Sequence, residues 1–321
     1  MSAPPVLLDR AREGIEKALD PVRLEKYRKI RQSYVIKPFM SQILTKREAI
    51  EFLGIDEKIF NNFFKNAEEF KNIPRSNGRG FFRFDKEELE NWLKSYKWRS
   101  IALDINDYAL CLDFALAQHF RGYVLSDWGS ARQREFGQKI TNWVKGQLAE
   151  VAVKKFFKNE FEVNIELDFR IYEDIVPQDI IGVVENGKNR NPRIGIGIKS
   201  SKPKSAFLIL GENEVNLKER RSDVYIFCRP DIPDDHLLRI THERIIDLVK
   251  KQQHYPSYKD KMPEFTNIPC EIAGWCNIDE LEKIEASKIP GLEDAIGFRY
   301  VKKTGNLHKD KESWKKLLNR L

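Results

Sequence analysis

Two apolar stretches on either side of a polar turn decide the fold of this chain: Ile175-Val-Pro-Gln-Asp179-Ile-Ile-Gly182 and Ile194-Gly-Ile-Gly-Ile-Lys199. Isoleucine alternates with glycine in the second stretch, so a strand there carries its isoleucines on one face and its glycines and Lys199 on the other. Two glycines beside a lysine leave space for a backbone or a ligand to approach. The pattern predicts a strand-turn-strand unit with Asp179 at the head of the first strand and Lys199 near the end of the second.

Further helical and strand patterns surround this unit. Apolar residues at spacings of three and four predict helices, and short apolar stretches between Gly, Asn and Pro predict strands. Helices flanking a mixed sheet define the fold class as α/β, or α+β. The helix at 104–121 is apolar nearly all round, so we expect it to be buried. The predicted helices are 7–32, 104–121, 131–158, 279–286 and 311–321, the predicted strands are 161–171, 179–184, 193–199, 205–210, 223–229, 271–277 and 296–302, and 236–251 mixes a strand and a helix.

The distribution of charge along the chain indicates a polyanionic partner. The 321 residues, enough for one large or two ordinary domains, carry a formal net charge of +7. Residues 1–100 carry +6, residues 101–300 carry −4 and residues 301–321 carry +5. A basic front, a mildly acidic middle and a basic tail favour localised contact with nucleic acid.

Several classes of protein do not fit the sequence. No apolar stretch reaches about 18 residues and the N-terminus has no signal-peptide core, so we expect a cytoplasmic protein without a membrane segment. The four cysteines form no CxxC pair, which argues against a structural zinc site. No G-x-x-x-x-G-K-[ST] loop is present, so we expect no nucleotide cofactor. His236, His242 and His254 have no metal-ligand spacing and are interpreted as surface residues or as residues near DNA.

Residues 41–97 begin with the pattern of two short helices. Thr45 is placed to cap the first helix, with Glu48 completing a capping box, and Gly54 suits the left-handed conformation that ends it. Asp56 then caps the second helix. Two short helices joined by a turn that contains glycine predict a helix-turn-helix.

A basic hairpin follows at 73–84, with its tip at Ser76-Asn77-Gly78, and a third helix begins at Asp85. The order of helix, turn, helix, basic hairpin and helix resembles the winged helix-turn-helix of the excisionase and MerR-like DNA-binding families. The resemblance implies a DNA-binding domain at 41–98, preceded by a helical arm at 1–40. The matching residues are Leu44, Thr45, Glu48, Ala49, Leu53, Gly54, Gly78, Arg79, Arg83, Phe84, Leu89 and Trp92.

Candidate DNA contacts lie on the second helix and in the wing. Asparagine and arginine can make bidentate contacts with base edges, whereas basic residues in a wing meet phosphates or the minor groove. A winged helix that mediates only protein contacts is the alternative. The candidates are Lys58, Asn61, Asn62 and Lys65 on the helix, and Arg75, Asn77 and Arg79 in the wing.

The residues after 130 suggest metal-dependent hydrolysis. Divalent-metal nucleases hold Mg²⁺ with carboxylates and use a lysine to stabilise the attacking water and the charge that develops on the phosphate. Asp179 and Lys199 supply these two groups, and Glu150 is a lone acid on an otherwise apolar helical stripe. The unit resembles the PD-(D/E)xK nucleases. Pro177-Gln-Asp179 is similar to their PD element with one insertion, and Gly146-Gln-Leu-Ala-Glu150 is similar to their GxxxE helix.

One position departs from that family. Its (D/E)xK acid falls on Gly197 here, so a carboxylate must come from elsewhere. Glu150 is the favoured replacement. Glu212 is a second option, because its spacing from Lys199 resembles a group of restriction enzymes in which the acid has moved downstream, and the carbonyl of Ile198 could complete a metal shell. Two further lysines extend the predicted phosphate contacts, Lys202 and Lys204.

Together the two resemblances imply a type II restriction endonuclease with an N-terminal winged helix-turn-helix and a C-terminal nuclease domain at 99–321. The implied cofactor is Mg²⁺ and the implied partner is double-stranded DNA, with Asp179 and Glu150 as metal ligands and Lys199 as the catalytic cation. Cleavage of both strands of a palindromic site favours a homodimer. Two alternatives stay open, namely a non-catalytic DNA-binding regulator whose nuclease fold has decayed and a recombination or repair nuclease.

Overall fold

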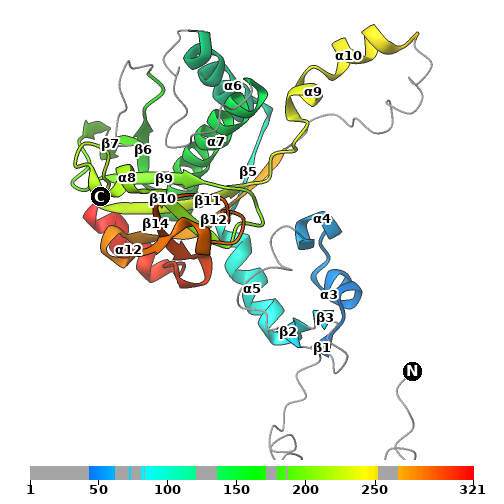
Figure 1. The fold of residues 1–321 in the computed structure, drawn as a ribbon, viewed down its shortest axis with the longest axis horizontal. Coiled ribbons are helices and arrows are strands. Elements are labelled where there is room, and N and C mark those ends of the chain that lie inside the picture. The colour runs from blue at the N-terminus through cyan, green and yellow to red at the C-terminus, as the bar shows by residue number, and fades with distance from the viewer. Residues whose placement is uncertain are drawn as a thin grey trace, which may run out of the picture.

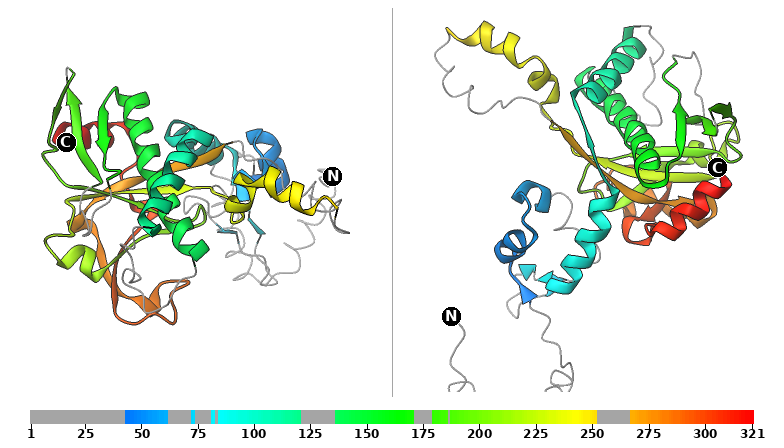
Figure 2. Two further views of the ribbon diagram at one scale, coloured as in Figure 1. Left: turned by 90° about the horizontal axis from the view of Figure 1, so that it is seen from above. Right: turned by 180° about the vertical axis from the view of Figure 1, so that it is seen from behind.

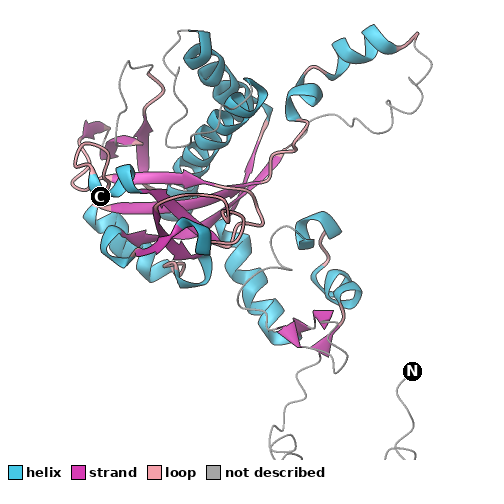
Figure 3. Ribbon diagram, viewed as in Figure 1, coloured by secondary structure: helices cyan, strands magenta, loops and turns pink. Residues whose placement is uncertain are grey.

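A four-stranded sheet forms the centre of the fold (Figure 1). The computed structural model describes residues 43–61, 72–73, 81–82, 84–120, 136–170, 179–185, 187–251 and 267–321. In order across the sheet, its strands are β5 (Ser100–Leu103), β12 (Ile268–Asn277), β11 (Val224–Pro230) and β9 (Ile196–Ser200). Strand β9 runs parallel to β11, and the other neighbouring pairs are antiparallel. The mixture of helices and strands agrees with the predicted α+β class (Figure 3).

The two faces of the central sheet pack against different layers. Val224, Ile226 and Cys228 point to one face and join a large hydrophobic cluster with the helices, whereas Tyr225 and Phe227 point to the other face and join a second cluster. Figure 1 shows two of the helices side by side on one side of the sheet. These helices are α6 (Ile105–Phe120) and α7 (Phe136–Phe161), joined in the first cluster by α12 (Lys311–Arg320). The second cluster is closed by the sheet of β10 (Phe207–Gly211), β14 (Phe298–Lys303) and β13 (Glu282–Glu285).

A separate antiparallel sheet carries the first of the two stretches that decide the fold. Its strands are β6 (Asn164–Leu167), β7 (Ile180–Glu185) and β8 (Lys188–Arg190). The prediction that 179–184 and 193–199 pair as one hairpin is wrong, because β7 turns into β8 while β9 leaves to pair with β11. Pro192 follows β8 and has no N–H with which to continue the ladder. The two stretches meet at one end, where the N–H of Asp179 donates to the carbonyl of Ile196 over 3.4 Å.

The caps predicted near the N-terminus are confirmed. The elements here are β1 (Ile43–Leu44), α3 (Lys46–Leu53), α4 (Glu57–Ile59), β2 (Asn72–Ile73), β3 (Phe81–Phe82), β4 (Phe84–Asp85) and α5 (Lys86–Arg99). Thr45 and Glu48 form the capping box of α3, and Gly54 ends it with φ of 60°. Asp56 and Asp85 cap α4 and α5. The base of the predicted hairpin is present as the β2–β3 pair, whereas its tip and most of the second helix lie outside the described residues.

This N-terminal unit has a hydrophobic cluster of its own. Phe60 and Phe84 meet edge to face at its centre, with ring centroids 5.0 Å apart. Helix α5 then runs directly into β5, and Arg99 at its end donates to the carbonyl of Ile272 over 2.5 Å. A division into domains at 98/99 therefore stays a prediction, as does the arm at 1–40, which lies outside the described residues.

The prediction of a helix at 279–286 is wrong. A single 3₁₀ turn (Ile278–Glu280) is followed by β13, which pairs with β14. Ile278, Leu281 and Ile284 lie three residues apart, which is a helical spacing, but Glu282–Glu285 pairs with β14, and this tertiary pairing overrides the local pattern. The side chain of Glu280 accepts from the N–H of Asn277 and so caps the start of the turn.

Two helix predictions differ from the structure in extent. Helix α6 is buried along one face only, since Tyr108, Cys111 and Ala115 are covered while Leu110 and Phe120 are exposed. Helix α7 extends to Phe161, so the strand predicted at 161–171 shrinks to β6. The predicted helix at 7–32 lies outside the described residues. Within the described ranges, no helix is long and apolar enough to cross a membrane.

Residues 236–251 form helices with no strand among them, which corrects the mixed prediction. The helices α9 (His236–Ile240) and α10 (His242–Val249) project away from the central sheet (Figure 2). His236, expected at the surface, is fully buried between the hydroxyls of Tyr108, 2.6 Å away, and Thr141, 2.9 Å away. An α6–α7 pair that presents two hydroxyls explains the burial, because it satisfies both ring nitrogens.

Candidate functional site

Three elements bring the predicted acids and lysine into one electrostatic group. Glu150 comes from the middle of α7, Asp179 from the residue before β7 and Lys199 from β9. Helix α7 packs on β9, and Ile196 and Ile198 of that strand lie in the cluster that α7 covers. The isoleucine face and the glycine–lysine face predicted for this strand are both present.

Glu150 is a buried carboxylate with 7% of its surface exposed. Its Oε1 accepts a hydrogen bond from Nε2 of Gln147, 2.9 Å away and one helical turn earlier. Burial raises the pKa of Glu150 well above its ordinary value of 4.5, and the charge of Asp179 raises it further, against the opposing effect of Lys199. Ionisation of Glu150 is therefore unfavourable in this site, and a bound cation would offset that unfavourable free energy.

Asp179 is tied to the neighbouring strand through its side chain as well as its backbone. Its Oδ2 accepts from the N–H of Ile198, so the carboxylate points across to β9. Burial raises the pKa of Asp179, although Lys199 and the Ile198 N–H both act to lower it. A buried carboxylate, Glu150, and a half-buried one, Asp179, both with raised pKa values, thus belong to one site.

Lys199 is held by an acid that sequence reasoning missed. Its Nζ donates to Oε1 of Glu214 over 2.6 Å, and Oε2 of Glu214 accepts from the N–H of Gly211 over 2.9 Å. Burial alone would lower the pKa of Lys199, but Glu214 and Asp179 outweigh it and the pKa is raised. Glu214 lies on α8 (Glu212–Asn216), and its position three residues after a glycine that begins a helix was the available signal.

Glu212, the second option for the missing acid, points elsewhere. Its Oε1 forms an ion pair with Nζ of Lys283 over 3.0 Å at the surface, and the hydrogen bond from Lys283 lowers the pKa of Glu212. A shift of two residues along α8 turns a side chain by about 200° around the helix axis. The acid beside Lys199 is therefore Glu214, and the expectation of Glu212 is corrected.

Gly197, where the nuclease family has its acid, has no room for a side chain. A Cβ at this position would lie 2.9 Å from Oγ of Ser222 and 3.0 Å from two ring carbons of Tyr225. The hydroxyl of Tyr225 donates to the carbonyl of Glu214 over 3.0 Å and accepts from the N–H of Ser222 over 3.2 Å. The aromatic ring that excludes an acid at Gly197 thus supports the helix that carries Glu214.

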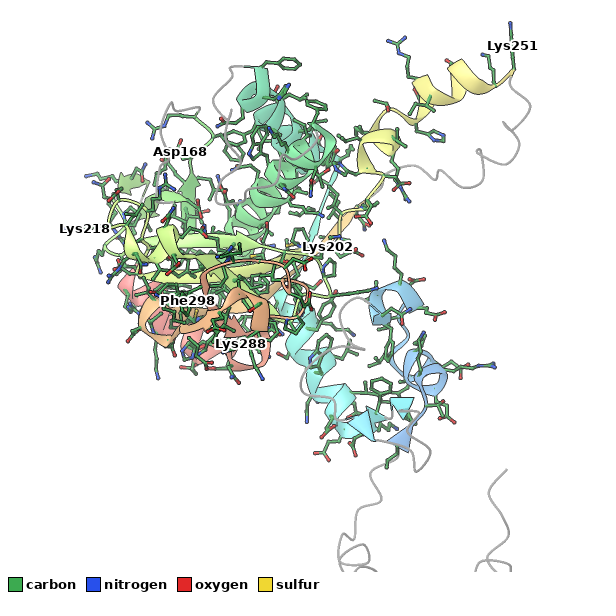
Figure 4. The ribbon with its side chains drawn as sticks, viewed as in Figure 1. Asp168, Lys202, Lys218, Lys251, Lys288 and Phe298 are labelled. Atoms are coloured by element: carbon green, nitrogen blue, oxygen red, sulfur yellow. The ribbon has the colours of Figure 1, made fainter. Side chains whose placement is uncertain are left out.

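Asp168 is a second acid that sequence reasoning missed. It directly follows β6, whose Leu167 pairs with Ile180 at the head of β7, and Figure 4 labels it at the end of that strand. Its two oxygens accept from Nε and Nη2 of Arg170 over 2.9 and 3.0 Å, and its charge contributes to the raised pKa of Glu150. Its place in a turn outside any motif gave no sequence signal.

Glu150 and Asp179 offer oxygen donors but do not form a closed metal site. No three His, Cys, Asp or Glu side chains in the described ranges converge closely enough to hold a metal. Magnesium is usually held through one or two carboxylates and keeps several waters, and hard oxygen donors are the type it prefers. Glu150 and Asp179 supply two such donors, so the pair suits a hydrated ion rather than a closed protein cage.

The predicted DNA contacts are only partly placed. Lys202 and Lys204 are exposed just after β9 (Figure 4). Lys58 is exposed on α4, and its Nζ lies 3.4 Å from Oδ2 of Asp231 at the end of β11. The side chain of Asn61 bonds to Glu57. The other predicted contacts, Asn62, Lys65, Arg75, Asn77 and Arg79, lie outside the described residues.

Comparisons with protein-family models, with curated proteins and with solved structures found no match. The functional interpretation therefore depends on the arrangement of the residues described above.

Proposed function

We propose that this chain is a cytoplasmic Mg²⁺-dependent endonuclease that cuts double-stranded DNA at a specific site, of the type II restriction class, and acts as a homodimer. The single observation that carries the proposal is that the buried Glu150 and the half-buried Asp179, which accepts a hydrogen bond from the N–H of Ile198, form one electrostatic group with Lys199. Buried like charges are expensive, and strongly perturbed groups of this kind are concentrated at functional sites.

In this proposal Asp179 and Glu150 hold the metal ion. When bound, Mg²⁺ polarises a phosphoryl oxygen and lowers the pKa of a coordinated water. Lys199 offsets the negative charge that develops on the scissile phosphate, since a fixed ammonium group in a partly dry site acts strongly on charge. Glu214 keeps that ammonium group charged and fixes its position.

The basic residues outside the centre supply DNA affinity. Lys202 and Lys204 are exposed beyond β9, and in this proposal they bind phosphates of the DNA. The N-terminal unit, with the capping box and hairpin of a winged helix-turn-helix pattern, is the proposed reader of base sequence. Its ion pair between Lys58 and Asp231 connects it to the end of β11.

The test uses purified full chain, a plasmid library of varied sequence and Mg²⁺, followed by sequencing of the ends. We expect discrete ends that share a sequence, and we expect Lys199→Ala to lower the cleavage rate about 100-fold or more. Lys288→Ala is the matched control, because it also removes a lysine–glutamate pair (3.0 Å, with Glu285) but on the exposed surface. Uncut DNA with wild type, or unimpaired cutting by Lys199→Ala, overturns the proposal, and ends without a common sequence indicate a repair or recombination nuclease.

One observation favours a second candidate, a DNA-binding regulator that does not cut. Lys199 is engaged by Glu214, and in the described part of the chain no third His, Cys, Asp or Glu side chain completes a metal site with Glu150 and Asp179. Such a protein binds specific DNA in a strongly salt-dependent way, with the same affinity in the presence and absence of Mg²⁺. Fluorescence anisotropy with a selected DNA site, at several salt concentrations, separates the two candidates.

A further inference from the structure

Gln147 is a polar residue at a buried position of α7. Its side chain lies on α7 with 8% of its surface exposed, and the other buried residues of this helix are apolar apart from Glu150. Nε2 donates to Oε1 of Glu150, while Oε1 of Gln147 is buried and has no hydrogen-bond partner among the described residues. An unsatisfied buried oxygen destabilises the fold, so its retention calls for an explanation such as a ligand that it binds.

The orientation of the amide follows from its neighbour. The NH₂ of Gln147 donates to the Glu150 carboxyl group, so the carbonyl oxygen of the amide is turned away from it. The three-residue spacing places both side chains on the same face of the helix. The unpaired oxygen therefore belongs to the same buried region as the Glu150 carboxylate.

We propose that Gln147 is a member of the cation site, in which Nε2 positions the Glu150 carboxylate and Oε1 supplies a neutral oxygen to the cation or to a water that the cation holds. This inference rests on the proposed function, because it assigns a third oxygen to the same site. The chemistry required is an acceptor for positive charge or for an O–H, and amide oxygens provide it for hard cations.

A purely structural role of Gln147 predicts a different effect of its substitution on cation affinity. A hydrogen bond that only stabilised the helix would leave cation affinity and its pH dependence untouched when removed. A positioning role predicts weaker cation binding, and binding that begins at higher pH, because the carboxylate loses a donor that favours its charged form.

The test is a titration of the full chain with Mn²⁺ in the absence of DNA, at several pH values. Binding is measured as the decrease in the EPR signal of free Mn²⁺. Manganese prefers the same oxygen ligands as magnesium. We expect Gln147→Met, which keeps the length but removes both polar atoms, to weaken binding about 10-fold or more. Gln147→Glu keeps an oxygen and loses the donor, so its affinity should fall at acid pH and recover at alkaline pH. Gln138→Met is the control, because Gln138 is exposed on the same helix.

The outcomes separate this inference from the proposed function. If wild type binds Mn²⁺ and both Gln147 variants titrate like Gln138→Met, the inference is overturned while the proposed function stands. If wild type neither binds Mn²⁺ nor cuts DNA, both fail. If Gln147→Met does not fold, Gln147→Glu decides alone, and an affinity equal to wild type at every pH overturns the inference.

Discussion

The ammonium group of Lys199 lies 2.6 Å from Oε1 of Glu214, a residue fifteen positions later on α8. The second oxygen of Glu214 is fixed by the N–H of Gly211, and its carbonyl is fixed by the hydroxyl of Tyr225. Glu214 is thus fixed by its own hydrogen bonds as well as by its ion pair with Lys199. This arrangement places a carboxylate beside Lys199 even though Gly197 leaves no room for one on the same strand.

Replacing Glu214 with glutamine should slow cleavage by about 10-fold or more, because the ammonium group loses a charged hydrogen-bond partner. Glu214 raises the pKa of Lys199, so its removal lowers that pKa and activity should decline at a less alkaline pH than in wild type. Rates measured across the alkaline range check both effects. Glu285→Gln, which breaks the surface pair with Lys288, should change neither, and an identical pH profile for both variants would contradict the prediction.

Gly197→Ala should destabilise the fold by about 1–3 kcal/mol, because its Cβ would meet Tyr225 and Ser222 at 3.0 Å or less. Gly146→Ala is the matched control in α7, where a Cβ meets nothing within 4 Å, and it should stabilise by about 0.5–1 kcal/mol. Urea denaturation of both variants measures these changes. Equal stability of the two alanine variants would show that Tyr225 can move aside.

Local features of this fold were predictable because neighbouring residues determine them. The capping box of Thr45 and Glu48, the left-handed Gly54 and the two faces of β9 each depend on a few adjacent positions. The same reasoning identified Glu150 as an acid that needs an explanation, and it is buried in the structure.

Pairings across long distances were not predictable in this way. The strand β9 selects β11 rather than β7, and that choice depends on a sheet assembled from 100–103, 224–230 and 268–277. Glu214 reaches Lys199 only because β10 has a particular length and ends at Gly211. The residues of a single strand do not determine which distant segment of the chain it pairs with.

Acid should destabilise the protein through His236. Burial, followed by the charge of Lys145, lowers the pKa of His236 from 6.5 to about 4. Between about pH 6.5 and about pH 4, His236 is therefore protonated in the unfolded chain and neutral in the folded chain. The free energy of unfolding falls as the pH drops through this range, by up to about 3 kcal/mol.

Denaturation midpoints across that pH range measure this effect. His236→Gln removes the titration and should flatten the dependence, whereas His119→Gln, at a half-buried position, should leave it in place. A dependence that survives unchanged in His236→Gln would assign the acid sensitivity to other groups.

Cation binding should release protons from the site and should depend on pH. Burial first, and then Asp179, raises the pKa of Glu150 above 4.5, so without a cation the folded chain holds a proton that the unfolded chain gives up. The sign follows from linkage, since stability from this group is present below pH 4.5 and is lost as the pH rises through the raised pKa. A cation requires the deprotonated carboxylate, so its affinity should rise over the same range.

Thermal unfolding with and without Mg²⁺, at pH values from 5 to about 8, measures this linkage. The stabilisation by Mg²⁺ should grow with pH in wild type and should nearly disappear in Glu150→Gln, which cannot carry the charge. Glu160→Gln is the control on the same helix, because Glu160 pairs with Lys311 at the surface over 3.1 Å. A shift in melting temperature that is equal at every pH, or that persists in Glu150→Gln, would place the cation somewhere other than Glu150 and Asp179.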